Sequence, residues 1–203
     1  MIEMSALGAG VLETRSIELA INHHTPLYLG KTLSNEKGTW IVPNDQMLER
    51  KAVTGVALDK DMDHATITYP GNQKGFLEDL FKRLEEAEIN IDMISHIQNE
   101  QDGLQLSFTF KDSDGMELNQ LFDSLKDTYQ DLYVKVETSY HKVSVIGAGM
   151  RDMTGVASKI FRTLLEQDIT FYQVTTSEIS VSYVVDGENG EKATRLLCEA
   201  FNL

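Results

Sequence analysis

Two glycines, Gly75 and Gly155, each follow a polar turn and precede a stretch with the apolar spacing of a helix. The first backbone N–H groups of a helix have no partner within it, and the helix dipole makes this end positive. Such an end suits a small carboxylate, for example that of an amino acid. Ordinary turn glycines would look the same locally, but the occurrence of the pattern twice favours a binding role.

Several polar side chains could bind the remainder of such a ligand. Asp92, between two apolar residues of an expected strand, could face a ligand amine, although such a residue is more often solvated or a helix–sheet contact. His96 on the same strand is either a surface residue or part of a polar pocket. Residues 175–178 (TTSE) could hydrogen-bond a polar ligand, but a hairpin turn needs the same chemistry.

The sequence disfavours other chemistries. Gly147-Ala148-Gly149 follows a strand pattern, but the third glycine of a dinucleotide loop would fall at Asp152, whose charge would repel a pyrophosphate. None of the five histidines has metal-ligand spacing to another histidine or to the single cysteine. No nucleophile elbow, phosphate-binding loop or paired-carboxylate pattern occurs. We therefore expect no catalytic residue, no metal and no cofactor.

The composition narrows the class of partner and the compartment. The 203-residue chain has a formal net charge of -14, which disfavours binding to nucleic acid or to an anionic membrane surface. No apolar run approaches the ~18 residues of a membrane span. The first residues lack the plan of a secretory signal, and one cysteine cannot form an internal disulfide. These features together favour the cytoplasm.

The two glycines belong to a divergent internal repeat. A glycine and four apolar positions recur at one constant offset of about 80 residues, which is improbable by chance. The matched positions are Gly75, Leu80, Phe81, Leu84 and Ile89 in the first copy and Gly155, Ile160, Phe161, Leu164 and Ile169 in the second. Two copies of a small unit without catalytic residues indicate a binding or regulatory module.

The first copy has the pattern of a complete small unit. Strands are expected at 65–70, 91–97, 104–110 and 132–140, with helices at 76–88 and after Asp112, where Met116 and Leu118 begin an apolar face. This βαββαβ order predicts an α+β fold of the ferredoxin-like type, an antiparallel sheet with helices on one face.

The second copy lacks its last strand. Strands are expected at 142–149, near 169–176 and at 178–185, with helices at 155–167 and about 189–201. An incomplete sheet would expose an unpaired edge. The alternating segment 53–59 can complete it, so we expect the first unit, 64–140, to be inserted into a second made of 51–63 plus 141–203. Residues 1–50 belong to neither, and should dock on a partner, pack loosely on the repeats or be partly disordered.

Several segments resemble the regulatory region of aspartate kinases, which consists of two ACT domains, the first inserted into the second. These segments are 90–98 (NIDMISHIQ), 142–161 and 175–185 (TTSEISVSYVV). Segments 5–20 and 25–41 are similar to the end of the family's kinase domain. The family's catalytic core has no counterpart in the sequence. The resemblance therefore implies a chain that is not an enzyme on its own, either a β subunit or an engineered fragment of that extent.

The resemblance also implies where an effector binds, namely where a loop and helix start of one ACT domain face a strand of another across a dimer interface. The implied first site comprises Asn72, Gln73, Lys74, Gly75, Phe76, Leu77, Ile91, Asp92 and His96, with Thr170 and Phe171 on the facing strand. The implied second site comprises Met150, Asp152, Gly155, Val156, Ser177 and Glu178. Asn72, Lys74, Thr154 and His96 depart from the residues usual in the family, and Asn72 offers an ammonium group only a neutral acceptor.

The resemblance implies a regulatory function in the aspartate pathway. The expected effector is an end-product amino acid, lysine or threonine, and the expected protein partners are a second copy of the chain and the full-length α subunit of the kinase. Effector binding that favours an inactive arrangement would give feedback inhibition. The alternative is an ACT scaffold that stabilises the kinase oligomer without binding a ligand.

Overall fold

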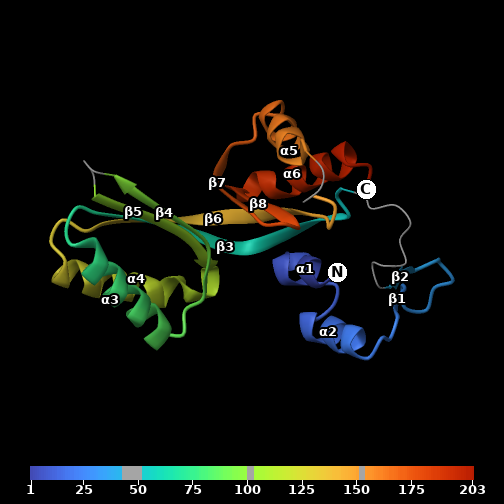
Figure 1. Cartoon of the computed structure of the whole chain (residues 1–203), viewed down its shortest axis with the longest axis horizontal. Coiled ribbons are helices and arrows are strands. Elements are labelled where there is room, and N and C mark those ends of the chain that lie inside the picture. The colour runs from blue at the N-terminus through green and yellow to red at the C-terminus, as the bar shows by residue number, and fades with distance from the viewer. Residues whose placement is uncertain (43–51, 100–102, 151–153) are drawn as a thin grey trace.

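The structure is a computed structural model and describes residues 1–42, 52–99, 103–150 and 154–203. Six strands form one antiparallel sheet in the order β4-β5-β3-β6-β8-β7 (Figure 1). The strands are β3 (Gly55–Tyr69), β4 (Ile91–Asn99), β5 (Gly103–Lys111), β6 (Tyr133–Ile146), β7 (Phe171–Thr176) and β8 (Ser180–Asp186). The helices packed on the sheet are α3 (Gln73–Glu86), α4 (Gly115–Thr128), α5 (Val156–Leu165) and α6 (Gly187–Ala200).

The long strands β3 and β6 pair with each other in two stretches. Residues 62–68 of β3 pair with 133–140 of β6, and residues 55–59 pair with 142–146. The register shifts between Asp59 and Met62 and again between Met62 and His64. The alternation in the sequence predicts four separate strands here, at 53–59, 65–70, 132–140 and 142–149. In the structure residues 60–63, three of which are charged, lie within a continuous but irregular ladder, because bulges accommodate extra residues without ending the pairing.

The first stretch belongs to the first unit, which comprises β3 from Met62 onward, α3, β4, β5, α4 and β6 up to Tyr140. Both helices bury apolar residues at helical spacing, whereas Phe81 is 39% exposed and Met116, in the first turn of α4, is 78% exposed, contrary to expectation. The core contains Ala65, Ile67, Phe76, Leu80, Leu84, Leu106, Phe108, Leu118, Phe122 and Leu125.

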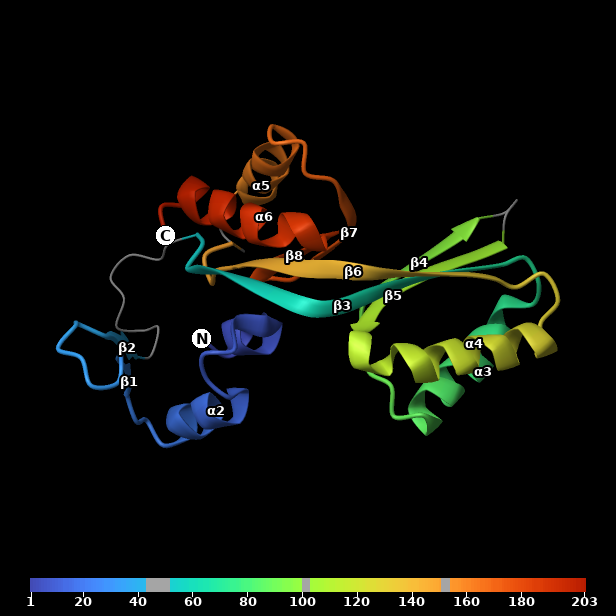
Figure 2. The same ribbon diagram turned by 180° about the vertical axis from the view of Figure 1, so that it is seen from behind.

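The second stretch belongs to the second unit, which comprises β3 up to Asp59, β6 from Lys142 onward, α5, β7, β8 and α6. Its core contains Val143, Val145, Ile160, Leu164, Ile169, Tyr183, Ala193 and Leu197. Figures 1 and 2 show α3 and α4 on one side of the sheet and α5 and α6 on the other. The two units therefore share strands but bury separate cores on opposite faces.

Tyr183 is the largest fully buried side chain of the second core, and its hydroxyl lacks a hydrogen-bond partner among the described residues. Burial raises the pKa of this phenol well above its usual range. Replacing Tyr183 with phenylalanine is expected to stabilise the protein by about 1 kcal/mol, because an unpaired buried hydroxyl is lost. Urea denaturation measures this. The control is Tyr129→Phe, which removes a hydrogen bond from the Tyr129 hydroxyl to Asp79 (3.1 Å) and should destabilise the protein. A loss of stability in Tyr183→Phe would contradict the expectation.

The N-terminal residues form a small, separate layer. It contains α1 (Ile2–Met4), a π-helical turn (Ser5–Ala9), α2 (Thr14–Asn22) and a hairpin of β1 (Leu27–Leu29) with β2 (Thr39–Ile41). The π-helical turn packs against β3, while Leu19, Ile21 and Trp40 are more than half exposed. The segment 43–51 lies outside the described residues. No helix in the described part of the chain is long and apolar enough to cross a membrane.

Candidate functional site

The first loop is built around the start of α3. The Asn72 side chain accepts a hydrogen bond from Gly75 N (3.4 Å), so Asn72 caps the helix that would receive a carboxylate. Lys74 is exposed, and Leu77 is partly buried against the first core. Phe76 is fully buried, and its ring packs 4.9 Å from that of Tyr69. The structure therefore places Phe76 beneath the loop, where it supports the helix start.

Strand β4 carries the carboxylate of the first site at the edge of the sheet. Ile91 packs against the first core, and His96 is exposed. Asp92 accepts hydrogen bonds from Met93 N (2.7 Å) and from Lys142 Nζ (2.8 Å). Burial acts to raise the pKa of Asp92, but the hydrogen bond and charge of Lys142 outweigh it and hold that pKa below its usual range. Asp92 is therefore an ionised, oriented acceptor.

Lys142 is a residue of this site that cannot be identified from the sequence. Its side chain is only 5% exposed, and its ammonium lies 2.8 Å from Asp92 and 3.8 Å from Asp59. Two carboxylates and one ammonium leave a net negative charge, which favours an additional ligand cation. No sequence signal marks Lys142, because a lysine beside a histidine at the start of a strand is usually solvated.

Two of the predicted residues line a pocket in the second unit. Thr170 and Phe171 lie at the start of β7 and, with Leu165, Asp168 and Ile169, enclose about 360 Å³. The Phe171 ring packs against Phe161 at 5.2 Å and so forms the apolar wall of the pocket. Thr170 is exposed and also lines the pocket. The pocket combines an apolar wall with an open polar rim.

The second loop leads into α5, as the repeat predicts. Gly155 is the N-cap of α5 and has a left-handed backbone (φ 89°), which favours glycine there. Val156 is buried and Met150 packs against the second core, while Asp152 lies outside the described residues. The Ser177 hydroxyl accepts from Ser180 N (3.0 Å), so it organises the hairpin turn next to the exposed Glu178. The described residues of this second set therefore form the hydrogen bond and the backbone conformation that are typical of turns.

The two units also meet at their edge strands. The side-chain nitrogen of Gln173 on β7 donates a hydrogen bond to the Met93 carbonyl on β4. The side-chain oxygen of Gln173 lies 3.1 Å from His64 Nε2 on β3. Gln173 and His64 are both buried. Burial lowers the pKa of His64, so its imidazole stays neutral near pH 7. Sequence reasoning does not find these residues, because periodicity within one strand does not show what covers its outer face.

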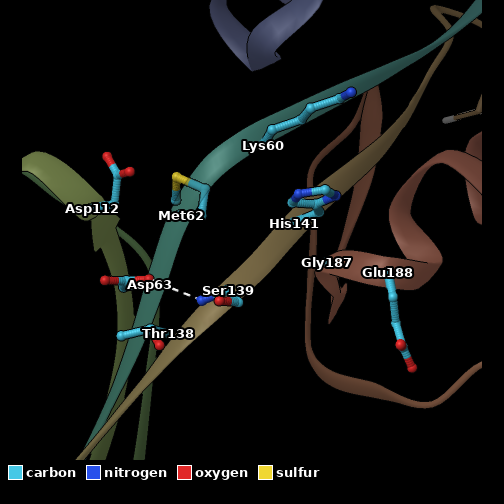
Figure 3. A pocket seen from close by; sticks show the side chains of 9 residues that line it. All are labelled: Lys60, Met62, Asp63, Asp112, Thr138, Ser139, His141, Gly187 and Glu188. Carbon is cyan, nitrogen blue, oxygen red and sulfur yellow. Dashed lines mark hydrogen bonds between the residues drawn. The ribbon is translucent and has the colours of Figure 1, made fainter.

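A larger pocket of about 490 Å³ lies where the two units join (Figure 3). Asp63, Ser139 and His141 line it, and Asp63 accepts from Ser139 N (3.3 Å). Burial raises the pKa of Asp63 and lowers that of His141, which favours the neutral form of both groups. The described residues of the two predicted sites do not line this pocket. No described group of three or more His, Cys, Asp or Glu residues could hold a metal ion.

Comparisons with known proteins point to one group. An ACT-domain family profile matches residues 143–201. Aspartokinase 2 of Bacillus subtilis is 34% identical over 203 residues, all of this chain and 50% of that protein. A chain of the crystal structure of aspartokinase alpha and beta subunits is 35% identical with a TM-score of 0.66, and the match covers 74% of this chain and 99% of that one.

The ligand-free regulatory subunit of aspartate kinase from Thermus thermophilus is similar in the same way. It is 28% identical with a TM-score of 0.69, and the match covers 74% of this chain and 99% of that subunit. The chain spans about half the length of the curated relatives it matches.

Proposed function

The chain belongs to the aspartokinase family, and from this premise we propose that it is the non-catalytic regulatory part of an aspartate kinase, which binds an end-product amino acid. The observation that carries the proposal is the match to almost all of one subunit chain of aspartokinase, but to only half of the full-length relatives. The catalysed reaction, transfer of a phosphoryl group from ATP to aspartate, would belong to the α subunit with which this chain assembles in the cytoplasm.

The proposed domains follow the two cores. We propose an ACT domain at 64–140, inserted into a second at 51–63 plus 141–203, with residues 1–50 as the end of a kinase domain. Separate cores on opposite faces of the shared strands support this division. The exposed apolar side chains Leu19, Ile21 and Trp40 support a contact between the N-terminal layer and the rest of a kinase.

The proposed first site offers groups for both ends of an amino acid. The start of α3, beside Asn72 and Lys74, takes a carboxylate, while Asp92 takes an ammonium group. Within one copy these groups lie at opposite ends of β4, because the helix start is level with Gln98 and Asp92 is level with His64, so one amino acid reaches both only across copies of the chain. Thr170 and Phe171 of a second copy of the chain complete the site across a dimer interface, where the pocket of about 360 Å³ accepts the side chain. Lysine and threonine are the proposed effectors. The equivalent positions around Gly155, Ser177 and Glu178 are the proposed second site.

A thermal-shift series tests the proposal. Lysine, threonine, methionine and diaminopimelate are added singly and in pairs, with D-lysine and D-threonine as controls. A ligand at 100 times its Kd adds about 2.7 kcal/mol, and each kcal/mol raises the Tm by about 2–4 °C at this size. We expect a rise of roughly 5–10 °C with L-lysine or L-threonine and none with the D-enantiomers. No rise with any ligand, while light scattering shows an intact dimer, would favour the scaffold alternative.

A further inference from the structure

Gln173 joins the two edges of the sheet that lie furthest apart in strand order. Strands β4 and β7 are the first and last of the six, yet the Gln173 amide donates to the Met93 carbonyl. Met93, Gln173 and His64 are each less than 9% exposed. Met93 also packs with Tyr140 and Val184 in a small cluster of its own, which buries the contact. The contact is therefore a closed junction between the units.

The hydrogen bonds show which atom of the Gln173 amide donates and which accepts. Its nitrogen donates to Met93, so its oxygen accepts, and His64 Nε2 must carry the hydrogen. In this tautomer His64 Nδ1 bears a lone pair, and it is buried without a hydrogen-bond partner among the described residues. The Glu137 carboxylate lies near it, with Oε2 4.0 Å from Nδ1. The tautomer therefore depends on Gln173.

Met93 and Gln173 occupy the same place in the internal repeat, at equal distances after Gly75 and Gly155. The ladder is irregular at both places, between Asp92 and Ser95 and between Phe171 and Gln173. Met93 has a left-handed backbone (φ 47°), which is uncommon for such a residue. The junction thus joins equivalent irregular points of the two units, where the ladder is locally disrupted.

Each side of the junction adjoins a candidate effector residue. Asp92 precedes Met93 and receives the Met93 N–H on its own carboxylate. Phe171 lies two residues before Gln173 and walls the pocket of the second unit. A displacement of β7 by a ligand at Phe171 would therefore move the Gln173 amide, and through the Met93 carbonyl it would reorient Asp92.

We propose that Gln173 is a positioning residue that couples the ligand-binding strands of the two units, so that occupation of one site alters the affinity of the other. The identity of the ligands in this inference rests on the proposed function, whereas the mechanical coupling of β7 to β4 does not. Coupling of this kind is reciprocal and typically changes affinity by about 5- to 150-fold.

The first test needs no ligand. Hydrogen–deuterium exchange of residues 91–97 is compared in the wild type, in Gln173→Met and in Val174→Ala. Val174, on the same strand, packs against the second core and serves as a matched control. We expect exchange in β4 to rise about five- to tenfold in Gln173→Met, the factor that loss of one hydrogen bond gives, and to stay unchanged in Val174→Ala. Unchanged β4 exchange in Gln173→Met, or equal changes in both variants, would overturn the proposal.

The second test uses whichever amino acids shift the Tm of the wild type. Calorimetric titration of one of them into the dimer should show a ratio of intrinsic affinities at the first and second sites that differs from one in the wild type and in Val174→Ala. The ratio should approach one in Gln173→Met. A ratio that persists in Gln173→Met would refute the coupling role. If no amino acid binds the wild type, the proposed function fails, and the exchange experiment still decides the coupling.

Discussion

Replacing Phe76 with alanine is expected to lower the free energy of unfolding by about 3–5 kcal/mol, the usual cost of removing a fully buried aromatic ring. The ring is inaccessible to solvent and contacts Tyr69 and Tyr129, with ring centroids 4.9 and 5.1 Å away. The alanine variant would leave a cavity below the first turn of α3, where the loop of the candidate site begins. Urea denaturation followed by circular dichroism measures the loss.

The matched control is Phe81→Ala on the same helix. Phe81 is 39% exposed and lies outside the first core, so its removal should cost less than about 1 kcal/mol. Similar losses in the two variants would show that Phe76 is not the anchor of this helix. The comparison also separates a structural role of Phe76 from contact with a ligand, because stability is measured without one.

Replacing Asp92 with asparagine is expected to cost about 2 kcal/mol at pH 7. The change leaves the buried Lys142 ammonium with only Asp59, 3.8 Å away. Breaking a buried ion pair costs about 3–5 kcal/mol, and the partial exposure of Asp92 together with the second carboxylate reduces this figure. Unfolding in urea at several pH values measures the cost.

The pH dependence has a definite sign. The folded pKa of Asp92 is lowered, so the stability that it contributes is present above the unfolded pKa of about 3.9 and is lost as the pH falls through the folded value. The difference between wild type and Asp92→Asn should therefore be largest at neutral pH and shrink below about pH 4. A difference that is constant from pH 7 to pH 3 would exclude the ion pair as its cause.

The double variant Asp92→Asn/Lys142→Met provides the control for this pair. Methionine has a similar length and no charge, so the double variant contains no unpaired ammonium. It should recover most of the stability that Asp92→Asn loses, because apolar replacement of a buried pair is often close to neutral. If the double variant is less stable than Asp92→Asn, the Lys142 ammonium is well accommodated without Asp92.

Much of the fold can be predicted from the sequence, because its signals are local. The helical spacing around Leu80 and Ile160 and the alternation in 104–110 identify α3, α5 and β5. The ferredoxin-like α+β fold of the ACT family is confirmed by the sheet order and by the comparisons. The continuity of β3 is not predictable in this way, because three of the four residues at 60–63 are charged, which is typical of a turn, and the strand continues only because pairing with β5 and β6 begins again at Met62.

The candidate site is harder to predict from the sequence than the fold, because segments that are distant in the sequence bury its residues. Asp92 is identifiable as an isolated acid in an apolar strand, but its partner Lys142 comes from another element. Gly147 is a second residue whose role cannot be predicted from its neighbours in the sequence. Its sequence context resembles a dinucleotide loop, whereas a Cβ there would lie 1.9 Å from the Ala52 carbonyl oxygen, so the glycine allows two backbones to approach closely.

The shared strands have a consequence for synthesis on the ribosome. The pairing partners and helices of the first unit all lie between residues 62 and 140, so this unit can form while later residues are still being translated. Residues 55–59 leave the ribosome earlier, but their partners at 142–146 follow much later. Until then the start of β3 is an unpaired edge, the kind of segment that binds other chains.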